Sequence, residues 1–351
     1  MNISLITYHY SGNHGAVMQA YALCRYLKEH GHNVQIIDIR QDESGGRPLI
    51  VEIVLFFVFG YRIRKILRKY YPSLTKHYKT MDALREDPPI SDVYIVGSDQ
   101  VWNPLISKEL MMAYFLDFGP ESMKRISYAS SFGKSKWIVD DPEVTEKVRK
   151  LLGRFTALSV REQQGKEICE TTFQLSPTVV LDPVFLNDNY SELVSKVYDG
   201  TEFICYKMNR TEDFWNNIQA VGELLGVKPT LLNYNYPKRG FKYCFPPSLT
   251  TWLKKLATAK FIITDSFHGI AFSIIFRKQF VAILNDDGLN SRLLNLMNVM
   301  GLQERVFPSV EAMLKNKSWM TRIDYSSKEE IINKQVSHSR EYLNKSLNLC
   351  R

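Results

Sequence analysis

Short apolar segments alternate along the chain with segments of helical spacing, and this alternation limits the possible folds more than any other feature. Near the start, apolar residues at 3–6 precede a turn at 11–15, a helical segment at 16–30 and a second apolar segment at 34–39. Parallel neighbouring strands need a long crossover, usually a helix, and such crossovers are nearly always right-handed. The first forty residues therefore predict a strand–helix–strand unit of a parallel sheet.

The alternation continues and then restarts in the second half of the chain. In the first half, strands are predicted at 93–96, 125–130, 157–160 and 178–181, with a helix at 141–153. In the second half, strands are predicted at 203–207, 230–232, 261–264 and 280–284, and helices at 212–225, 249–259, 269–276 and 290–300. The pattern predicts an α/β fold: two doubly wound, Rossmann-like domains that face a cleft.

The length of 351 residues also fits two domains. A polar stretch at 187–195 is the expected boundary, which gives an N-terminal domain at 1–190 and a C-terminal domain at 191–325. The tail at 326–351 has the spacing of a polar amphipathic helix, and it is a candidate to pack back on the N-terminal domain.

Charge and cysteine usage narrow the partners and the compartment. The net charge of +8 favours anionic partners, yet no segment has the interleaved basic and aromatic residues of a nucleic-acid module, so we expect no nucleic acid. The five cysteines are scattered and form no CxxC pair, which indicates reduced thiols in a cytoplasmic protein and no metal site. The first residues lack the features of a secretory signal, so we expect none.

Two polar motifs follow strands of the first half. Residues 12–15 hold Asn13, His14 and Gly15 in a glycine turn whose backbone N–H groups, at a helix start, suit an anion or a sugar hydroxyl. A plain strand-to-helix turn explains the same residues equally well.

The second motif, at 97–104, follows a buried strand. Asp99, Gln100 and Asn103 offer polar groups at the edge of the sheet where such folds bind ligands, and Trp102 offers an aromatic face for a sugar ring. The alternative is a structural loop with a capping Asp and a core Trp.

A histidine motif occupies 264–269, where a predicted strand meets a helix. His268 can titrate near neutral pH, so it is a candidate acid or base. Three cations occupy comparable positions: Arg161 and Lys207 at strand ends and Arg292 at a helix start. Arg161 has no evident acidic partner in sequence before its neighbour Glu162, so we expect it to bind an anion.

An apolar segment followed by a basic one occupies 48–71. Five cations fall between Arg62 and Lys69, and the apolar part is shorter than the roughly 20 residues that a spanning helix needs. Such a segment is typical of peripheral contact with an anionic membrane, but a core-packed helix with a basic exposed end has the same pattern.

Taken together, these segments resemble the polysaccharide pyruvyl transferase family. The resemblance covers residues 1 to about 306 and rests on blocks in the family's order: NHGAVMQAYAL at 13–23, GSDQVWN at 97–103, SVRE at 159–162, LDP at 181–183, TDSFHG at 264–269, and a helix from Ser291-Arg292 to Gly301-Leu302. It implies a fold similar to the two-domain GT-B glycosyltransferases, phosphoenolpyruvate as donor, and neither cofactor nor essential metal.

The resemblance also implies the reaction, formation of a cyclic pyruvate ketal on a sugar, expected to be of galactose type, in a capsule or exopolysaccharide precursor. One branch of the family has Arg where this chain has Ser266, so Arg292 or Lys207 would supply that contact. The resulting assignments are His268 and Asp99 as catalytic residues; Arg161, Lys207, Ser266, Gly269 and Arg292 for the donor; and Asn13, His14, Gly15, Gln100, Trp102 and Asn103 for the acceptor.

Two other functions stay open at this point. A glycosyltransferase of the same fold would use a nucleotide sugar, for which Asp286 and Asp287 are the available acidic residues in the second domain. A non-catalytic glycan-binding protein is the other. For the pyruvyl transferase we expect a cytoplasmic location at the inner membrane surface and a lipid-linked acceptor.

Overall fold

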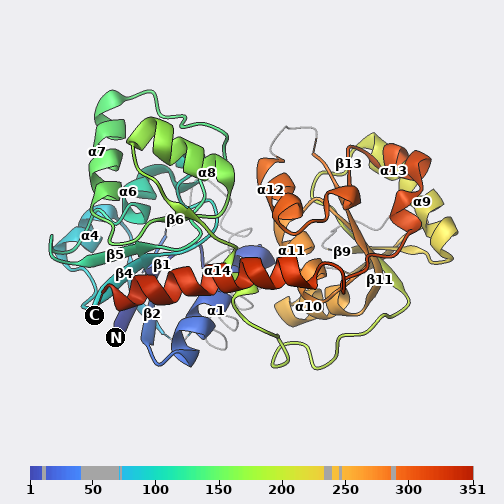
Figure 1. Ribbon diagram of the computed structural model, residues 1–351, viewed down its shortest axis with the longest axis horizontal. Coiled ribbons are helices and arrows are strands. Elements are labelled where there is room, and N and C mark those ends of the chain that lie inside the picture. The colour runs from blue at the N-terminus through green and yellow to red at the C-terminus, as the bar shows by residue number, and fades with distance from the viewer. Residues whose placement is uncertain are drawn as a thin grey trace, which may run out of the picture. The chain divides into compact units, whose positions relative to one another are not determined.

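Each half of the chain builds its own parallel sheet with helices around it (Figure 1). The computed structural model describes residues 1–9, 13–40, 71, 73–232, 239–244, 247–285 and 290–350. The chain divides into a first unit, Met1–Asn187 with Val336–Arg351, and a second unit, Asp188–Gln335. The basic segment at 62–69, Asp286-Asp287 and residues 11–12 of the glycine turn lie outside the described residues.

The sheet of the first unit has the strand order β3-β2-β1-β4-β5, with all neighbours parallel. A short pair, β6-β7, continues the row through bridges from Ile126 to Ala157 and from Ser130 to Val160. The chain leaves β1 in one direction and later resumes at β4 on its other side, so the strand order reverses there. The strands are β1 (Asn2–Ile6), β2 (Asn33–Ile39), β3 (Leu74–Tyr78), β4 (Val93–Val96), β5 (Lys124–Ser127), β6 (Ser159–Val160) and β7 (Thr178–Val179).

The helices of the first unit start at polar capping residues. Asn13 caps the first helix by accepting a hydrogen bond from Gly15 N at 2.9 Å, and Asp141 caps α7 in the same way. The helices are α1 (His14–Glu29), α4 (Met81–Glu86), α5 (Pro104–Ser107), α6 (Met111–Tyr114), α7 (Pro142–Gly153) and α8 (Gln163–Ile168), with further turns at η2 (Lys108–Leu110), η3 (Cys169–Phe173) and η4 (Pro183–Phe185).

The sheet of the second unit has the order β10-β9-β8-β11-β12-β13 and is again parallel throughout. Its strand order reverses between β8 and β11, as it does between β1 and β4 in the first unit. The strands are β8 (Glu202–Tyr206), β9 (Pro229–Leu232), β10 (Lys242–Cys244), β11 (Ala259–Thr264), β12 (Phe280–Ile283) and β13 (Val306–Phe307).

The helices of the second unit have clear start and stop signals. In α9, the Thr211 side chain accepts from Phe214 N, and Gly226 ends the helix at a φ of 67°, where a residue without Cβ is least strained. The helices are α9 (Glu212–Leu225), α10 (Leu249–Ala257), α11 (Phe267–Ile275), α12 (Ser291–Val299) and α13 (Val310–Asn316), with short turns at η5 (Gln303–Arg305) and η6 (Ser318–Met320).

The last helix, α14 (Glu329–Asn348), starts in the second unit, and its part from Val336 onward belongs to the first. This part is bonded to the first unit's strand ends: Ser339 Oγ accepts from Leu181 N at 2.9 Å, and Tyr342 Oη donates to Ser127 O at 3.1 Å. Among the described residues, no helix combines the length and the apolar character needed to cross a membrane.

Candidate active site

In doubly wound sheets, ligands bind at the carboxyl ends of the strands where the strand order reverses. In the first unit, a network of buried charges surrounds this point. Arg161 Nη1 lies 2.8 Å from Asp182 Oδ2, which also accepts from the Ser98 hydroxyl at 2.8 Å. Nη2 is 3.8 Å from Asp99 Oδ1, and Nε is 3.7 Å from Glu162 Oε2. One guanidinium thus joins three carboxylates from three different strand ends.

This environment differs from the one expected for Arg161, because the sequence suggested no acidic partner before Glu162. Burial by itself would lower the pKa of Arg161, but the carboxylates of Asp182, Asp99 and Glu162 raise it. Since the side chain is only 1% exposed, an incoming anion would have to compete with those carboxylates. Arg161 is therefore the counter-ion of three carboxylates at this edge of the sheet.

The backbone at Asp99 is held in an unfavourable conformation. Its φ is 75°, in the left-handed region, and Ala129 at the end of the neighbouring strand has a φ of 55°. The Asp99 carboxylate is locked by a hydrogen bond from Gln100 N at 2.9 Å. Non-glycine residues in this region are strained and are often found at functional sites, which keeps Asp99 a candidate.

Trp102 does not offer a face to a sugar, and that prediction is wrong. Its side chain is fully buried and stacks on Phe115 with ring centroids 5.6 Å apart and an interplanar angle of 8°. Its indole N–H donates to Tyr114 O at 2.8 Å. Phe115 and Phe132 pack against the ring in the core. The alternative interpretation, a core Trp in a structural loop, therefore describes this residue.

Two of the other acceptor-side candidates, Asn103 and Asn13, cap helices. Asn103 is 3% exposed; its Oδ1 accepts from Leu105 N at 3.1 Å to start α5, and its Nδ2 donates to Gln100 Oε1 at 3.0 Å. Asn13 is exposed at the start of α1, followed by half-buried His14 and buried Gly15. These residues lie after β1 and β4, the two strands at which the order reverses.

Sequence reasoning missed a cluster of ionisable groups at the ends of β1, β2 and β3. Asp38 accepts two hydrogen bonds from Arg40, at 2.5 and 2.6 Å, and its carboxylate lies 3.2 Å from His9 Nε2 and 3.5 Å from His77 Nδ1. Burial acts to raise the pKa of Asp38, but the hydrogen bonds from His9 and Arg40 outweigh it and lower the pKa to about 2. No local sequence motif predicts this cluster, because its members are up to 68 residues apart in the chain.

In the second unit, Asp265 organises the point where the strand order reverses. It follows β11, and its carboxylate accepts from Met208 N at 2.7 Å, from Asn209 N at 2.8 Å and from Lys207 Nζ at 3.2 Å. Lys207 is almost fully buried, so its charge is neutralised inside the fold. A donor anion that contacts Lys207, as the sequence predicts, would therefore have to compete with Asp265.

His268 lies in the first turn of α11, three residues after Asp265. Its exposed fraction is 6%. Ser266 caps the helix, its Oγ accepting from Gly269 N at 3.3 Å. A Cβ on Gly269 would come within 2.4 Å of Thr264 Oγ1 and 2.9 Å of a Tyr206 ring carbon. Only glycine allows α11 to start this close to β8 and β11, and this closeness places His268 at the edge of the sheet.

Arg292 lies in the first turn of α12, after the adjacent strand β12. Asn290, two residues before Arg292, accepts a hydrogen bond from Asn285 N and donates one to Asn285 O, both at 2.8 Å. Lys207, His268 and Arg292 thus follow β8, β11 and β12, three neighbouring strands of one parallel sheet. These three candidates therefore follow neighbouring strands of the second unit, whereas Arg161, the other predicted cation, belongs to the first unit.

Comparison with known proteins gives a family and a fold. The family model described as polysaccharide pyruvyl transferase matches residues 13–287. No curated protein matches the chain. Similar solved structures include a UDP-GlcNAc 2-epimerase from Neisseria meningitidis bound to UDP-GlcNAc, with a TM-score of 0.56, 10% identity and 99% of each chain covered.

Two further structures have the same overall fold. One is a putative UDP-N-acetylglucosamine 2-epimerase from Listeria monocytogenes, with a TM-score of 0.53 and 11% identity over 96% of this chain and 90% of that one. The other is an Arabidopsis thaliana protein complexed with UDP-L-rhamnose, with a TM-score of 0.54 and 11% identity over 100% and 99%. At such low identity the likeness shows the fold alone, which is the GT-B type with two Rossmann-like units.

Proposed function

The chain belongs to the polysaccharide pyruvyl transferase family, and on that premise we propose that it transfers the pyruvyl group of phosphoenolpyruvate to two hydroxyls of one sugar as a cyclic ketal. The observation that carries the proposal is the position of His268, buried in the first turn of α11 where the strand order of the second unit reverses. Family membership makes the chain a transferase; the donor and the sugar are the proposed part.

The chemistry asks for one proton donor, cations for two anionic groups, and a base. The enol double bond is protonated at its methylene carbon, and one sugar hydroxyl attacks the resulting electron-poor carbon. Phosphate leaves, and a second hydroxyl of the same sugar closes the ring. We assign the proton transfers to His268, because histidine side chains commonly act as general acids and bases in enzymes.

The anionic groups of the donor need a cation. Because Arg292 stands in the first turn of α12, after the strand β12 that neighbours β11, we assign the first contact to Arg292. Arginine is suited to this role since its planar guanidinium binds phosphate or carboxylate through two parallel hydrogen bonds. Ser266 and the N–H groups at the start of α11 would add neutral donors beside it.

For the acceptor we assign the first unit, with Asp99 as the second catalytic group. Its carboxylate is 15% exposed and fixed beside Arg161, so it can accept a proton or a hydrogen bond from a sugar hydroxyl. Asn13, His14, Gly15 and Gln100 surround the same strand ends. A galactose-type sugar on a lipid-linked precursor of a capsule or exopolysaccharide is the proposed acceptor.

A glycosyltransferase that uses a nucleotide sugar is the second candidate. The specific observation in its favour is that structures of the same fold were solved with UDP-GlcNAc and UDP-L-rhamnose. Thermal-shift measurements separate the candidates, because a bound ligand raises the melting temperature. A shift with phosphoenolpyruvate supports the pyruvyl transferase, a shift with UDP-sugars supports the glycosyltransferase, and a shift with glycan alone supports a binding protein.

The decisive experiment is a transfer assay. The enzyme is incubated with phosphoenolpyruvate and a panel of synthetic and lipid-linked galactosides, and the products are weighed by mass spectrometry. The proposal requires an acceptor that gains one pyruvyl group as phosphate is released in equal amount. Transfer of a sugar from a UDP-sugar, with no reaction of phosphoenolpyruvate, would replace the proposal by its rival.

A further inference from the structure

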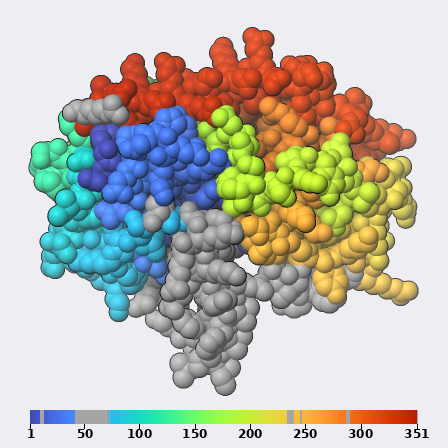
Figure 2. Space-filling model, turned by 90° about the horizontal axis from the view of Figure 1, so that it is seen from below, coloured from blue at the N-terminus to red at the C-terminus, as the bar shows by residue number. Residues whose placement is uncertain are grey.

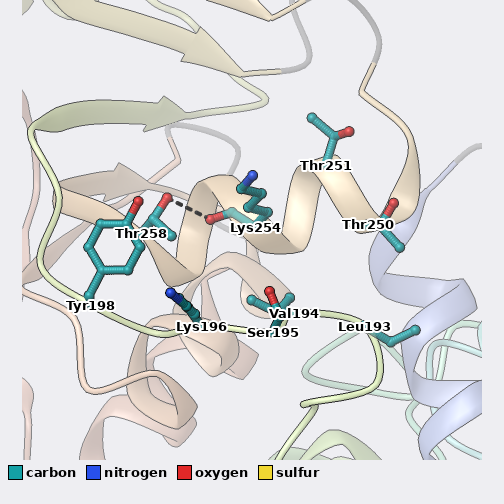
Figure 3. A pocket seen from close by; sticks show the side chains of 9 residues that line it. All are labelled: Leu193, Val194, Ser195, Lys196, Tyr198, Thr250, Thr251, Lys254 and Thr258. Atoms are coloured by element: carbon teal, nitrogen blue, oxygen red, sulfur yellow. Dashed lines mark hydrogen bonds between the residues drawn. The ribbon is translucent and has the colours of Figure 1, made fainter.

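The second unit contains a pocket of about 260 Å³ that the candidate active site does not use. It lies between α10 and the segment that leads into β8, at residues 193–198 (Figure 3). In Figure 2 this segment, in yellow-green, lies against the orange surface of α10. Its lining is mostly polar, with hydroxyl and ammonium groups from both segments.

The wall of the pocket is fixed before any ligand arrives. Lys278 Nζ donates to Tyr198 O and to Asp199 Oδ1, both at 2.8 Å, and Tyr198 N donates to Ala257 O at 3.3 Å. A Cβ on Gly200 would lie 2.3 Å from Thr258 O, so the segment packs against the end of α10 more closely than any other residue would allow. A rigid wall favours binding because little conformational entropy is lost when a ligand enters.

Two lysines give the pocket its charge. Lys196 comes from the segment and Lys254 from α10, and none of the described residues that line the pocket is acidic. The acidic residues nearest in sequence are already bound to other cations, Asp199 at 2.8 Å and Glu202 at 2.6 Å. Within the described ranges, neither Lys196 nor Lys254 forms an ion pair, so two like charges share one pocket without a counter-ion.

Hydroxyl groups complete the lining. Ser195, Thr250 and Thr251 contribute hydroxyls, which can both donate and accept hydrogen bonds. Those of Thr250 and Thr251 lie 3.2 and 2.8 Å from Ser248 Oγ, and the hydroxyl of Thr258 donates to Lys254 O at 2.9 Å (Figure 3). Two ammonium groups suit one oxyanion, and several hydroxyls suit a polyol attached to it. We propose that this pocket is a second binding site of the protein and that it binds a sugar phosphate monoester.

Isothermal titration of the full chain tests the proposal with three probes: glucose 1-phosphate, inorganic phosphate and glucose. We expect glucose 1-phosphate to bind more tightly than either part alone, and more weakly as salt is raised. Replacing both lysines, K196Q with K254Q, should raise the Kd for glucose 1-phosphate about tenfold or more, because two charge-assisted contacts are lost. The matched control is K242Q, which removes an exposed lysine on β10 outside the pocket.

Pyruvyl transfer by the double variant distinguishes this site from the candidate active site. We expect the variant to keep its transfer activity while it loses glucose 1-phosphate, since neither lysine belongs to the proposed catalytic groups. Unchanged affinity in the double variant would place the ligand elsewhere and overturn the proposal. Equal affinity for inorganic phosphate and glucose 1-phosphate would reject the sugar, and absence of binding at millimolar probe would reject the site.

Discussion

At the scale of single residues, His268 carries the proposed chemistry. Its replacement by Ala should lower turnover by at least about 10²-fold, the usual contribution of a positioned acid or base. Phosphate release from phosphoenolpyruvate in the presence of acceptor measures it, and circular dichroism checks that the variant is folded. H338A, which removes an exposed histidine from α14, is the control and should keep its activity. A well-folded H268A enzyme with near-normal turnover would remove His268 from the mechanism.

Gly269 allows α11 to start close to β11, and this packing positions His268. G269A would bring a Cβ within 2.4 Å of Thr264 Oγ1, so α11 must shift or the core must strain, at a cost of about 1–3 kcal/mol in the free energy of unfolding. Urea denaturation measures this cost, and the transfer assay should show a loss of turnover beyond it. G153A is the matched control: no atom lies within 4 Å of its Cβ, so its stability should be unchanged or slightly higher.

Asp38 should make stability depend on acid pH. Its pKa is about 2 in the fold, below the ordinary value near 3.9, so its contribution is fully present above pH 4 and is lost as pH falls towards 2. The size is on the order of 2 kcal/mol. Urea denaturation of the wild type and D38N at pH 6 and pH 3 measures the contribution. The stability gap between them should narrow at pH 3, and a constant gap would show that the ion pairs with Arg40 and His9 are not the cause.

At the scale of elements, α14 is tied to the first unit by a few buried hydrogen bonds. S339A removes the acceptor of Leu181 N and leaves that buried N–H without its partner, which should cost about 1–3 kcal/mol of unfolding free energy. S337A changes an exposed serine of the same helix, so it matches the change in helix propensity and should be nearly neutral. Equal melting temperatures for the two variants would mean that this contact contributes little to the packing of α14.

Elements that are central to a sheet followed the sequence pattern closely, and three edge strands did not. The helix predicted at 212–225 is α9, Glu212–Leu225, with the expected polar start and glycine end. The strands β3, β10 and β13 were not predicted. They lie at the ends of their strand rows, and β3 and β10 hold mostly exposed or half-buried side chains. An edge strand forms because the neighbouring strand offers free backbone N–H and C=O groups. The residues of the edge strand itself therefore need not show a strand pattern.

At the scale of the whole molecule, the property to test is binding of the protein to an anionic membrane surface. The sequence predicts that the apolar and basic segment at 48–71 holds the enzyme at an anionic surface, with each cation contributing about 1 kcal/mol. Flotation with anionic liposomes should show binding that weakens at high salt and when the five cations between Arg62 and Lys69 are neutralised. Neutral liposomes are the control. No binding to anionic liposomes at low salt would contradict the membrane prediction. It would favour the alternative interpretation of the segment, a core-packed helix with a basic exposed end.

The order of the main elements and the parallel sheets were determined by the sequence alone, because hydrophobic periodicity and helix caps are local properties. The position of His268 after a buried strand and before Gly269 could be predicted for the same reason. The surroundings of side chains could not. Arg161 meets Asp99 and Asp182 only because β4, β6 and β7 end at the same edge of one row of parallel strands. Trp102 turns inward because Phe115 and Phe132 pack around it. Charge pairing and burial depend on residues far apart in the chain, and only the tertiary structure brings them into contact.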